Sequence, residues 1–250
     1  MAQVRGSAGS FTSNEAVRKA RRNIAVTLIV MAIIGLVEGY LFAVFLHKIY
    51  LPIIGLVLLS ICGYFLFKHA DKYMEQLEKE KINFRKGAVG EYLVAGLLER
   101  DLSNNFYVIN DLSTPHGDID HVVVGPTGIF LIDTKNWRGA VKADDKGELL
   151  LNNKPINKPE IKNFQVRVME IRNRFLSLCN LDDIYFQPIF VFPTAWVDPT
   201  WGSTRNVCCM TDEKLIEYIE NQKPPKNFMS SSMAQYVTAF EALGRFDKKL

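Results

Sequence analysis

The chain has 250 residues, of which 48% are hydrophobic and 23% are charged, and its formal net charge at pH 7 is +3. This small charge does not indicate nucleic-acid binding by the chain as a whole, so any such affinity must come from a local basic cluster. The four cysteines form no Cys-x-x-Cys pair, and the four histidines lack zinc-site spacing. These spacings argue against a zinc site, a disulfide framework and a cysteine nucleophile.

Two long apolar runs occupy the first third of the chain, at residues 24–46 and 49–67. Each is long enough to cross a hydrocarbon core of about 30 Å at roughly 1.5 Å per helical residue. They predict two transmembrane helices, a hairpin over residues 24–67 in contact with the lipid bilayer. A buried pair of soluble helices is the alternative. A signal peptide fits poorly, because a polar segment precedes the first run and no small-residue cleavage pattern follows it.

Basic residues flank the hairpin on both outer sides, whereas its connector offers only Lys48. The positive-inside rule then places both termini and the downstream domain in the cytoplasm, with two passes through the cell membrane. Residues 1–23 are predicted to be a basic cytoplasmic segment and residues 68–85 a charged helical stalk. Residues 86–250 are long enough for one domain with its own core.

Periodicity predicts an α/β order in this domain. The expected elements are a helix at residues 84–100, strands at 106–112, 119–124 and 129–135, a helix at 160–178, and a strand at 185–192. A polar loop is expected at residues 152–159, a strand around residues 208–209, and further helices at 211–220 and 231–243. The order α-β-β-β-α-β predicts a mixed sheet flanked by helices.

The two strands joined by residues 125–128 carry the strongest functional signal. If the hairpin closes through a two- or four-residue loop, Val122 lies opposite Leu131 and Asp120 lies opposite Asp133. Like charges placed opposite each other destabilise a sheet, so this register indicates a bound cation. A three-residue loop with a bulge at Gly128 would separate the acids, and the sequence leaves both registers open.

Two carboxylates and the backbone carbonyl of Thr134 are suitable oxygen ligands for Mg²⁺ or Mn²⁺. Lys135, on the same strand face as Asp133, can reach a reacting water or phosphoryl oxygen. This pattern predicts metal-assisted hydrolysis of phosphodiester bonds. The alternative is that both acids are solvated strand ends and Lys135 is an ordinary surface charge, since acid-x-Lys is a very common triplet.

Specific motifs in this region resemble the nuclease-related domain family, a branch of the PD-(D/E)XK nuclease superfamily. They are Gly90-Glu91, the DIDHVVV segment at residues 118–124, the GIFLIDTKN segment at residues 128–136, and Gly139. The resemblance covers residues 86–141 with specific spacing and extends more loosely to residue 193. It implies a PD-(D/E)XK-like core, here preceded by the two predicted transmembrane helices.

The resemblance also implies roles for individual residues. Asp120 and Asp133 match the metal-binding acids, Lys135 the catalytic lysine, and Glu91 a helical glutamate that supports the metal site. Gln165 matches a further polar residue near such sites. Asp133 stands where many relatives carry the longer Glu, which puts the metal distance and the rate in doubt. Independently of the family, Gly90 is expected to let its helix approach another backbone.

Nucleic-acid contacts are expected from aromatic and basic residues around the hairpin, and Trp137 fits a packing role equally well. The predicted contacts are Trp137, Arg138, Lys142, Lys162 and Arg167. The leading hypothesis is a membrane-anchored, metal-dependent nuclease that acts on nucleic acid, with DNA favoured, on the cytoplasmic side. The alternatives are a non-cleaving nucleic-acid-binding module and a membrane scaffold. The oligomeric state stays open, a homo-oligomer included.

Overall fold

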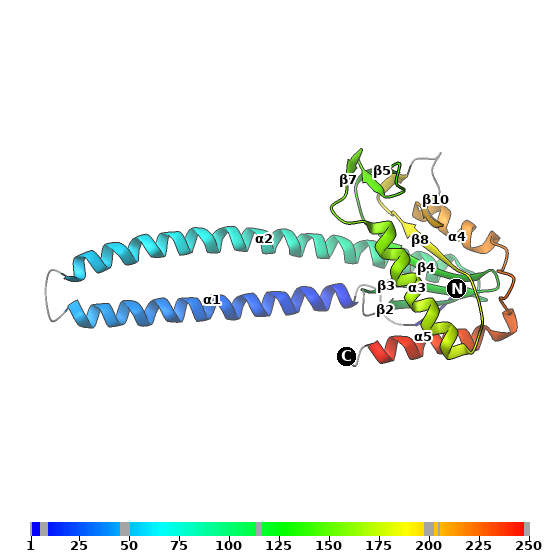
Figure 1. Cartoon of the computed structure of the whole chain (residues 1–250), viewed down its shortest axis with the longest axis horizontal. Helices are drawn as coiled ribbons and strands as arrows, with labels where there is room; N and C mark the ends of the chain where they lie inside the picture. The colour runs from blue at the N-terminus through cyan, green and yellow to red at the C-terminus, as the bar shows by residue number, and fades with distance from the viewer. Residues whose placement is uncertain are drawn as a thin grey trace. The chain divides into compact units, whose positions relative to one another are not determined.

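The computed structural model describes residues 2–5, 10–45, 51–113, 117–197, 203–204 and 206–247. The chain divides into two compact units, one formed by Thr12–Arg85 and the other by Met1–Phe11 together with Lys86–Leu250. Helix α1 (Ser10–Phe45) and most of α2 (Leu51–Asp101) belong to the first of these, and α2 continues into the second (Figure 1). All the strands lie in the second unit.

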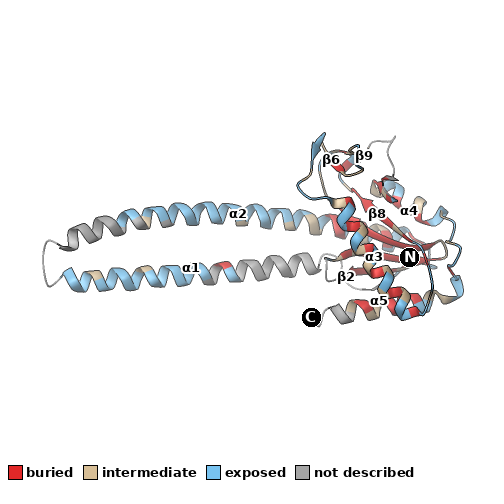
Figure 2. Ribbon diagram, in the orientation of Figure 1, coloured by how far each residue is buried: buried red, intermediate tan, exposed pale blue. Residues whose placement is uncertain are grey.

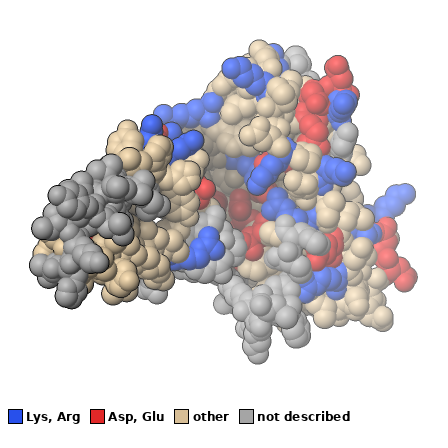
Figure 3. Space-filling model, turned by 60° about the vertical axis from the view of Figure 1, so that its left-hand side comes forward, with Lys and Arg blue, Asp and Glu red and all other residues tan. Residues whose placement is uncertain are grey.

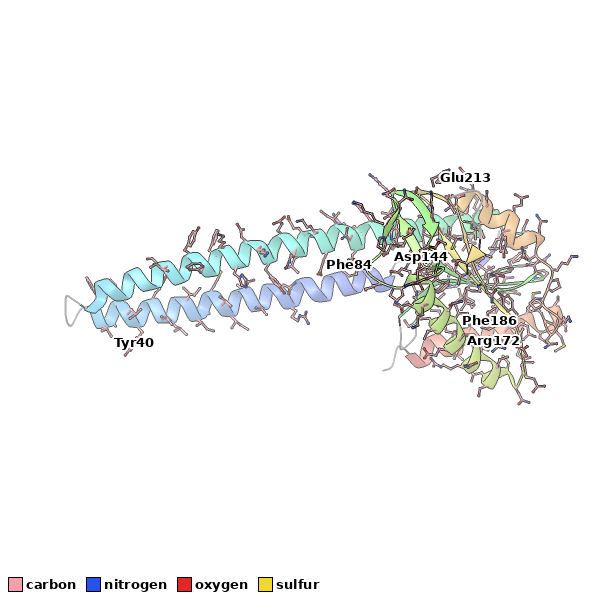
Figure 4. The ribbon with its side chains drawn as sticks, turned by 45° about the horizontal axis from the view of Figure 1, so that its top comes forward. Tyr40, Phe84, Asp144, Arg172, Phe186 and Glu213 are labelled. Atoms are coloured by element: carbon pink, nitrogen blue, oxygen red, sulfur yellow. The ribbon has the colours of Figure 1, made fainter. Side chains whose placement is uncertain are left out.

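Helix α1 contains a candidate membrane span at Val26–Phe45, by length and composition. Its 20 residues have a mean hydropathy of 2.4, and none of the window is buried. Large apolar side chains stay exposed on it, such as Leu36 at 75% and Tyr40 at 71% (Figures 2 and 4).

One of the two predicted spans, in α1, is a candidate membrane span among the described residues, and the second stays a prediction. Residues 49 and 50 of the second apolar run lie outside the described part of the chain, as does the connector before them. The rest of that run begins α2, which continues without a break for 51 residues. The predicted stalk at 68–85 and the helix at 84–100 are parts of α2, since no proline after residue 52 interrupts it.

The main sheet has seven strands in the order β1-β2-β3-β4-β8-β11-β10. Strands β2, β3 and β4 are antiparallel neighbours, while β4, β8 and β11 are parallel neighbours. Strand β1 comes from the segment predicted as a basic N-terminal region, and it pairs parallel to β2. The strand bounds are β1 Gln3–Arg5, β2 Tyr107–Leu112, β3 Ile119–Gly125, β4 Gly128–Thr134, β8 Phe186–Val191, β10 Ser203–Thr204 and β11 Val207–Met210.

Helices cover both faces of this sheet, as a mixed sheet with buried central strands requires. Helices α3 (Glu160–Cys179) and α5 (Met233–Asp247) pack on the face that carries Val122 and Leu131. The end of α2 and helix α4 (Asp212–Asn221) pack on the opposite face, and a short 3-10 helix (Ser230–Ser232) precedes α5. Figure 2 shows the buried residues concentrated in the sheet between these helices. The predicted mixed sheet flanked by helices is confirmed.

A second, smaller sheet has the strand order β7-β6-β5-β9. Strand β5 (Gly139–Ala143) follows β4 after four residues, and β9 (Ala195–Val197) follows β8 after three. Because β4 and β8 are parallel, both connections leave the main sheet at the same end. Strands β6 (Leu149–Leu151) and β7 (Lys154–Pro155) complete it. The sequence analysis missed this sheet and assigned β7 to a loop, since strands this short carry little periodicity.

Candidate active site

The β3–β4 hairpin closes through the two-residue loop Pro126-Thr127, because Gly125 pairs with Gly128. Val124 lies opposite Ile129 and Val122 opposite Leu131, so the predicted register is confirmed and the bulged alternative is wrong. Continued by one step beyond the last paired residues, this register places Asp120 beside Asp133. The Thr134 backbone N–H donates to Asp120 Oδ2 at 2.5 Å, which holds the two strand ends together.

Both acids project toward the α3 face of the main sheet, as strand alternation from Val122 and Leu131 requires. His121 faces the other way and is fully buried, with its Nδ1 2.7 Å from Asn110 Oδ1. Burial lowers the pKa of His121 to about 3, so its ring stays neutral. His121 is therefore a buried packing residue. His116 lies outside the described residues.

Asp133 is almost completely buried, and each of its two oxygens faces a different cation. Lys135 Nζ lies 2.6 Å from Oδ1, and an Arg167 terminal nitrogen lies 2.5 Å from Oδ2. Burial opposes ionisation of Asp133, but the charges of Lys135 and Arg167 outweigh it and hold the pKa of this carboxyl below its ordinary value. Asp133 is therefore a carboxylate.

Lys135 lies between two carboxylates. Its Nζ is 2.6 Å from Asp133 and 3.5 Å from Glu160 Oε2 at the start of α3, and it lies 5.5 Å above the ring centre of Phe190. Burial alone would lower the pKa of Lys135, but Asp133, Glu160 and Asp120 together raise it above its ordinary value. The side chain is thus a fixed ammonium group and not a general base.

Asp120 has the opposite electrostatic situation to Asp133. Burial, followed by the negative charges of Asp133 and Glu91, raises the pKa of Asp120 well above its ordinary value, although Lys135 and the Thr134 amide counteract them. No cationic side chain among the described residues forms an ion pair with Asp120. The negative charge that Asp120 would carry when ionised is therefore not compensated, which favours its protonated form.

Helix α2 brings the negative charge of Glu91 close enough to affect Asp120, because Gly90 lets the helix approach Asn136 closely. A Cβ at Gly90 would lie 2.6 Å from the Cβ of Asn136, which directly follows Lys135. Asn136 Nδ2 donates to the Lys86 carbonyl at 2.6 Å, and Thr194 Oγ1 donates to Asn136 Oδ1 at 2.7 Å. Asn136 thus connects α2 to the ends of β4 and β8. Glu91, which follows Gly90 on this helix, has a buried side chain that is 8% exposed.

The structure places the predicted nucleic-acid contacts in different surroundings. Arg167 belongs to the acid cluster, since it contacts Asp133 and donates to the Asp118 carbonyl, and its side chain is 13% exposed. Trp137 packs on Phe192, with ring centres 5.6 Å apart, and lies against the core. Arg138 and Lys162 are exposed, Lys142 is partly exposed on β5, and Gln165 is partly buried on α3.

Glu160 is a member of the site that the sequence analysis missed. It is the first residue of α3, and its carboxylate pairs with Lys135 across 25 residues of chain. An acid in the first turn of a helix is common for reasons of helix polarity alone, so its residue type gave no functional signal. Only the path of the chain through the small sheet brings it to Lys135.

The carboxylates of Asp120 and Asp133 suit a metal ion that retains most of its water ligands. Among the described residues no group of three or more His, Cys, Asp or Glu side chains is arranged to hold a metal ion. Two neighbouring carboxylates, one without a cationic partner, fit Mg²⁺ or Mn²⁺, which bind through one or two carboxylates and retain several waters. They do not fit a structural zinc site, which needs four protein ligands.

The described residues also line a pocket of about 300 Å³ at the other end of the β3–β4 hairpin. Its walls include Thr127 and Gly128 of the turn, Gln187 of β8, and Lys223 and Pro225 after α4. None of the acid cluster borders this pocket, so it is separate from the candidate site.

Comparisons with known proteins point to the same region of the chain. Residues 86–193 match the family described as Nuclease-related domain. A stretch of 78 residues is 32% identical to an uncharacterized protein of Bacillus anthracis, and it covers 29% of this chain and 37% of that protein. The chain thus spans well under half of this relative's length. No solved structure matches the chain.

Proposed function

We propose, from the match of residues 86–193 to the family described as Nuclease-related domain, that this chain is a metal-dependent nuclease that hydrolyses phosphodiester bonds of nucleic acid. DNA is the first substrate to test. The observation that carries the proposal is the pairing of two carboxylates, Asp120 and Asp133, beside the fixed ammonium group of Lys135. In a domain with a purely structural role, two neighbouring buried carboxylates would repel each other and lower the stability without any benefit.

Asp120 and Asp133 would hold Mg²⁺ or Mn²⁺, with the Thr134 carbonyl as the further predicted ligand. When bound, such an ion activates a water and neutralises phosphate charge. Asp120 has no cationic partner among the described residues and is the acid with most to gain from a cation. Asp133 is already ionised, so it needs no deprotonation before it can bind. Glu91 adds negative charge from α2, which would favour a bound cation beside Asp120.

Lys135 acts as a charge and hydrogen-bond donor in this proposal. Its raised pKa keeps all three N–H groups on the nitrogen, and its contacts with Asp133 and Glu160 fix their position. A fixed ammonium stabilises the negative charge that develops on phosphoryl oxygens and on the leaving group, at no reorganisation cost. Arg167 holds the second oxygen of Asp133 through an ion pair of 2.5 Å.

The test is cleavage by the full-length chain purified in detergent, with plasmid DNA and end-labelled single strands as substrates. Cleavage is expected with Mg²⁺ or Mn²⁺ and not with EDTA. Asp120→Asn, Asp133→Asn and Lys135→Met should each lose on the order of 10² to 10³ in rate. Asp145→Asn, an exposed acid on the β5–β6 turn, is the matched control and should cut like the parent. Equal cleavage by all four variants would contradict the proposal.

A non-cleaving nucleic-acid-binding module is the second candidate, and one observation favours it. Both oxygens of Asp133 already have cationic partners, which partly neutralises the site without any metal. In that case nucleic acid would bind equally well with EDTA, and no divalent ion would promote cleavage. The uncompensated charge at Asp120 favours the nuclease.

We also propose that Val26–Phe45 of α1 and the apolar start of α2 form a two-pass anchor in a lipid bilayer, with the nuclease-related domain on the cytoplasmic side. The length, the hydropathy of 2.4 and the exposed apolar surface of the α1 segment support the anchor. The basic residues that flank the two apolar runs on their outer sides support the orientation, and so does the pairing of β1 with β2, which requires the chain before α1 and the domain after α2 to lie on the same side. The chain should remain with membranes after alkaline carbonate washing, whereas Leu36→Asp should release part of it. Protease added to intact cells should leave the domain uncut. A fully soluble parent chain would contradict this anchor.

A further inference from the structure

The small sheet has one face that packs on the core and one that does not. Val141, Leu149 and Ala195 are buried on the inner face and join the core beneath α3. Residues paired across neighbouring strands project to the same side, so the register defines the opposite, outer face. We call this the outer face of the small sheet, and it consists of Ala140, Lys142, Leu150, Pro155 and Trp196.

Trp196 dominates the outer face and is 53% exposed. It lies beside Ala140 in the adjacent strand, and a side chain as small as alanine leaves the neighbouring face of the indole open. Lys142 follows two residues later on the same side of β5, opposite Leu150. A half-exposed tryptophan on a sheet is an unusual use of a large apolar side chain, because burying it would stabilise the fold.

Hydrogen bonds and packing fix the small sheet with respect to the acid cluster. Thr194 Oγ1, just before β9, donates to both Asn136 Oδ1 and the Trp137 carbonyl, which ties together the two connections from the main sheet. Trp137 packs below them on Phe192. Ala140 is five residues after Lys135, so their Cα atoms are at most about 18 Å apart. A nucleic-acid strand bound at the candidate active site could therefore contact the outer face a few nucleotides away.

The charges around the outer face favour a polyanion. Asp144 and Glu148 of this sheet are occupied within the chain: Asp144 accepts from the Glu148 amide at 2.7 Å, and Glu148 accepts from the Ile161 and Lys162 amides at the start of α3. By contrast, Arg138, Lys142, Lys154 and Lys158 form no ion pair with any described residue. Figure 3 shows Lys and Arg side chains at the top of the domain, where Figure 1 labels β5 and β7, and Figure 4 places Asp144 in the same sheet region.

We propose that the outer face of the small sheet is a stacking surface for an unpaired base of the strand that enters the active site. Trp196 contacts the base, and Lys142 with Arg138 contacts the phosphates on either side of it. Aromatic stacking accepts every base, so this contact recognises unpaired strand rather than sequence. The inference rests on nucleic acid as the substrate in the proposed function, and it assigns that substrate a single-stranded segment.

The test measures binding by the full-length chain in detergent, with EDTA present so that no cleavage occurs. The probes are a fluorescent oligothymidylate of about 20 nucleotides and a blunt duplex of the same length, followed by anisotropy. Trp196→Ala should weaken binding of the single strand by about 5- to 100-fold and binding of the duplex by less than about twofold. Trp196→Phe should retain binding within about threefold. Lys142→Ala should lower the salt dependence of single-strand binding by close to one counterion.

Tyr185→Ala is the matched control, because Tyr185 is a 47% exposed aromatic residue next to the pocket at the opposite end of the hairpin. It should bind both probes like the parent. Unchanged single-strand binding by Trp196→Ala, or equal losses for single strand and duplex, would overturn the inference. Far-ultraviolet circular dichroism of each variant verifies that the fold is retained.

The binding result and the cleavage result are independent of each other. Metal-dependent cleavage that needs Asp120, together with unchanged binding by Trp196→Ala, would leave the nuclease proposal in place and remove the stacking surface. Selective loss of single-strand binding, with no cleavage under any divalent ion, would leave the stacking surface and remove the nuclease.

Discussion

Replacement of Gly90 by alanine tests how α2 is positioned at the active site. A Cβ at this position would lie 2.6 Å from Asn136 Cβ and 3.2 Å from its Cγ. Carbon atoms prefer a separation of about 3.5 to 4.0 Å, so either the helix or Asn136 must move by about 1 Å. Asn136 follows Lys135 directly and Glu91 follows Gly90, so this movement occurs inside the candidate site.

The expected free energy change combines three contributions. Alanine gains about 1 kcal/mol over glycine within a helix. Overpacking at a tight contact costs about 1 to 3 kcal/mol. Displacement of Asn136 also weakens its hydrogen bonds to the Lys86 carbonyl and Thr194, each worth about 1 kcal/mol. Gly90→Ala should therefore destabilise the domain by about 1 to 3 kcal/mol.

Gly96→Ala provides the matched control on the same helix, because nothing lies within 4 Å of its added Cβ. It should stabilise the domain by up to about 1 kcal/mol. Urea unfolding followed by tryptophan fluorescence measures both changes, since the chain's three tryptophans, Trp137, Trp196 and Trp201, all follow residue 136. The two variants should differ in unfolding free energy by about 1 to 4 kcal/mol, and only Gly90→Ala should reduce cleavage. Equal stability and equal cleavage would refute the close approach of α2.

Three further predictions concern ionisable side chains that are buried in or near the candidate site. Lys135→Met should destabilise the domain by about 1 to 3 kcal/mol, in addition to its loss of cleavage rate, because Asp133 Oδ1 loses its cation. Lys135→Arg should recover stability more than activity, and urea unfolding and plasmid cleavage separate the two effects. Arg167→Met should also destabilise the domain, because Asp133 loses an ion-pair partner. The same change should tighten Mn²⁺ binding measured by calorimetry, because it removes a cation that competes with the metal for Asp133. Weaker Mn²⁺ binding would disagree with this reasoning. His121 should make the domain less stable in acid. Its folded pKa of about 3 lies below the unfolded value of about 6.5, so only the unfolded state binds this proton between these values. The contribution of His121 is complete above pH 6.5 and is lost at about 1.4 kcal/mol per pH unit as the pH falls toward 3. His121→Leu should flatten the dependence of unfolding free energy on pH in this window, and an unchanged slope would count against a neutral buried ring.

The β3–β4 hairpin could be predicted from the sequence because alternation and a two-residue loop fix its register together. Val122, Leu131 and the two acids lie on the predicted face. Lys135 lowers the pKa of Asp133, and Asp133 raises the pKa of Asp120. Gly90 was correctly expected to allow a close approach, although the neighbour is the Asn136 side chain. These features are local, so a short stretch of sequence determines them.

Features that depend on the path of the chain through the small sheet could not be predicted. Glu160 reaches Lys135 only after β5, β6 and β7, and Arg167 turns its charge inward to Asp133 because α3 lies across that end of the main sheet. Trp137 and Trp196 look alike in sequence as aromatic residues after a strand, yet the first packs on Phe192 and the second stays exposed. The second apolar run, the stalk at 68–85 and the helix at 84–100 were predicted as separate segments, and α2 joins them in one continuous helix over Leu51–Asp101.

Binding of Mn²⁺ to the full-length chain tests the central claim most directly. Titration calorimetry of the parent should show one ion per chain, with affinity at least tenfold weaker in Asp120→Asn and Asp133→Asn and unchanged in Asp145→Asn. Absence of binding to the parent, or binding that survives in both site variants, would contradict a metal site formed by these two acids.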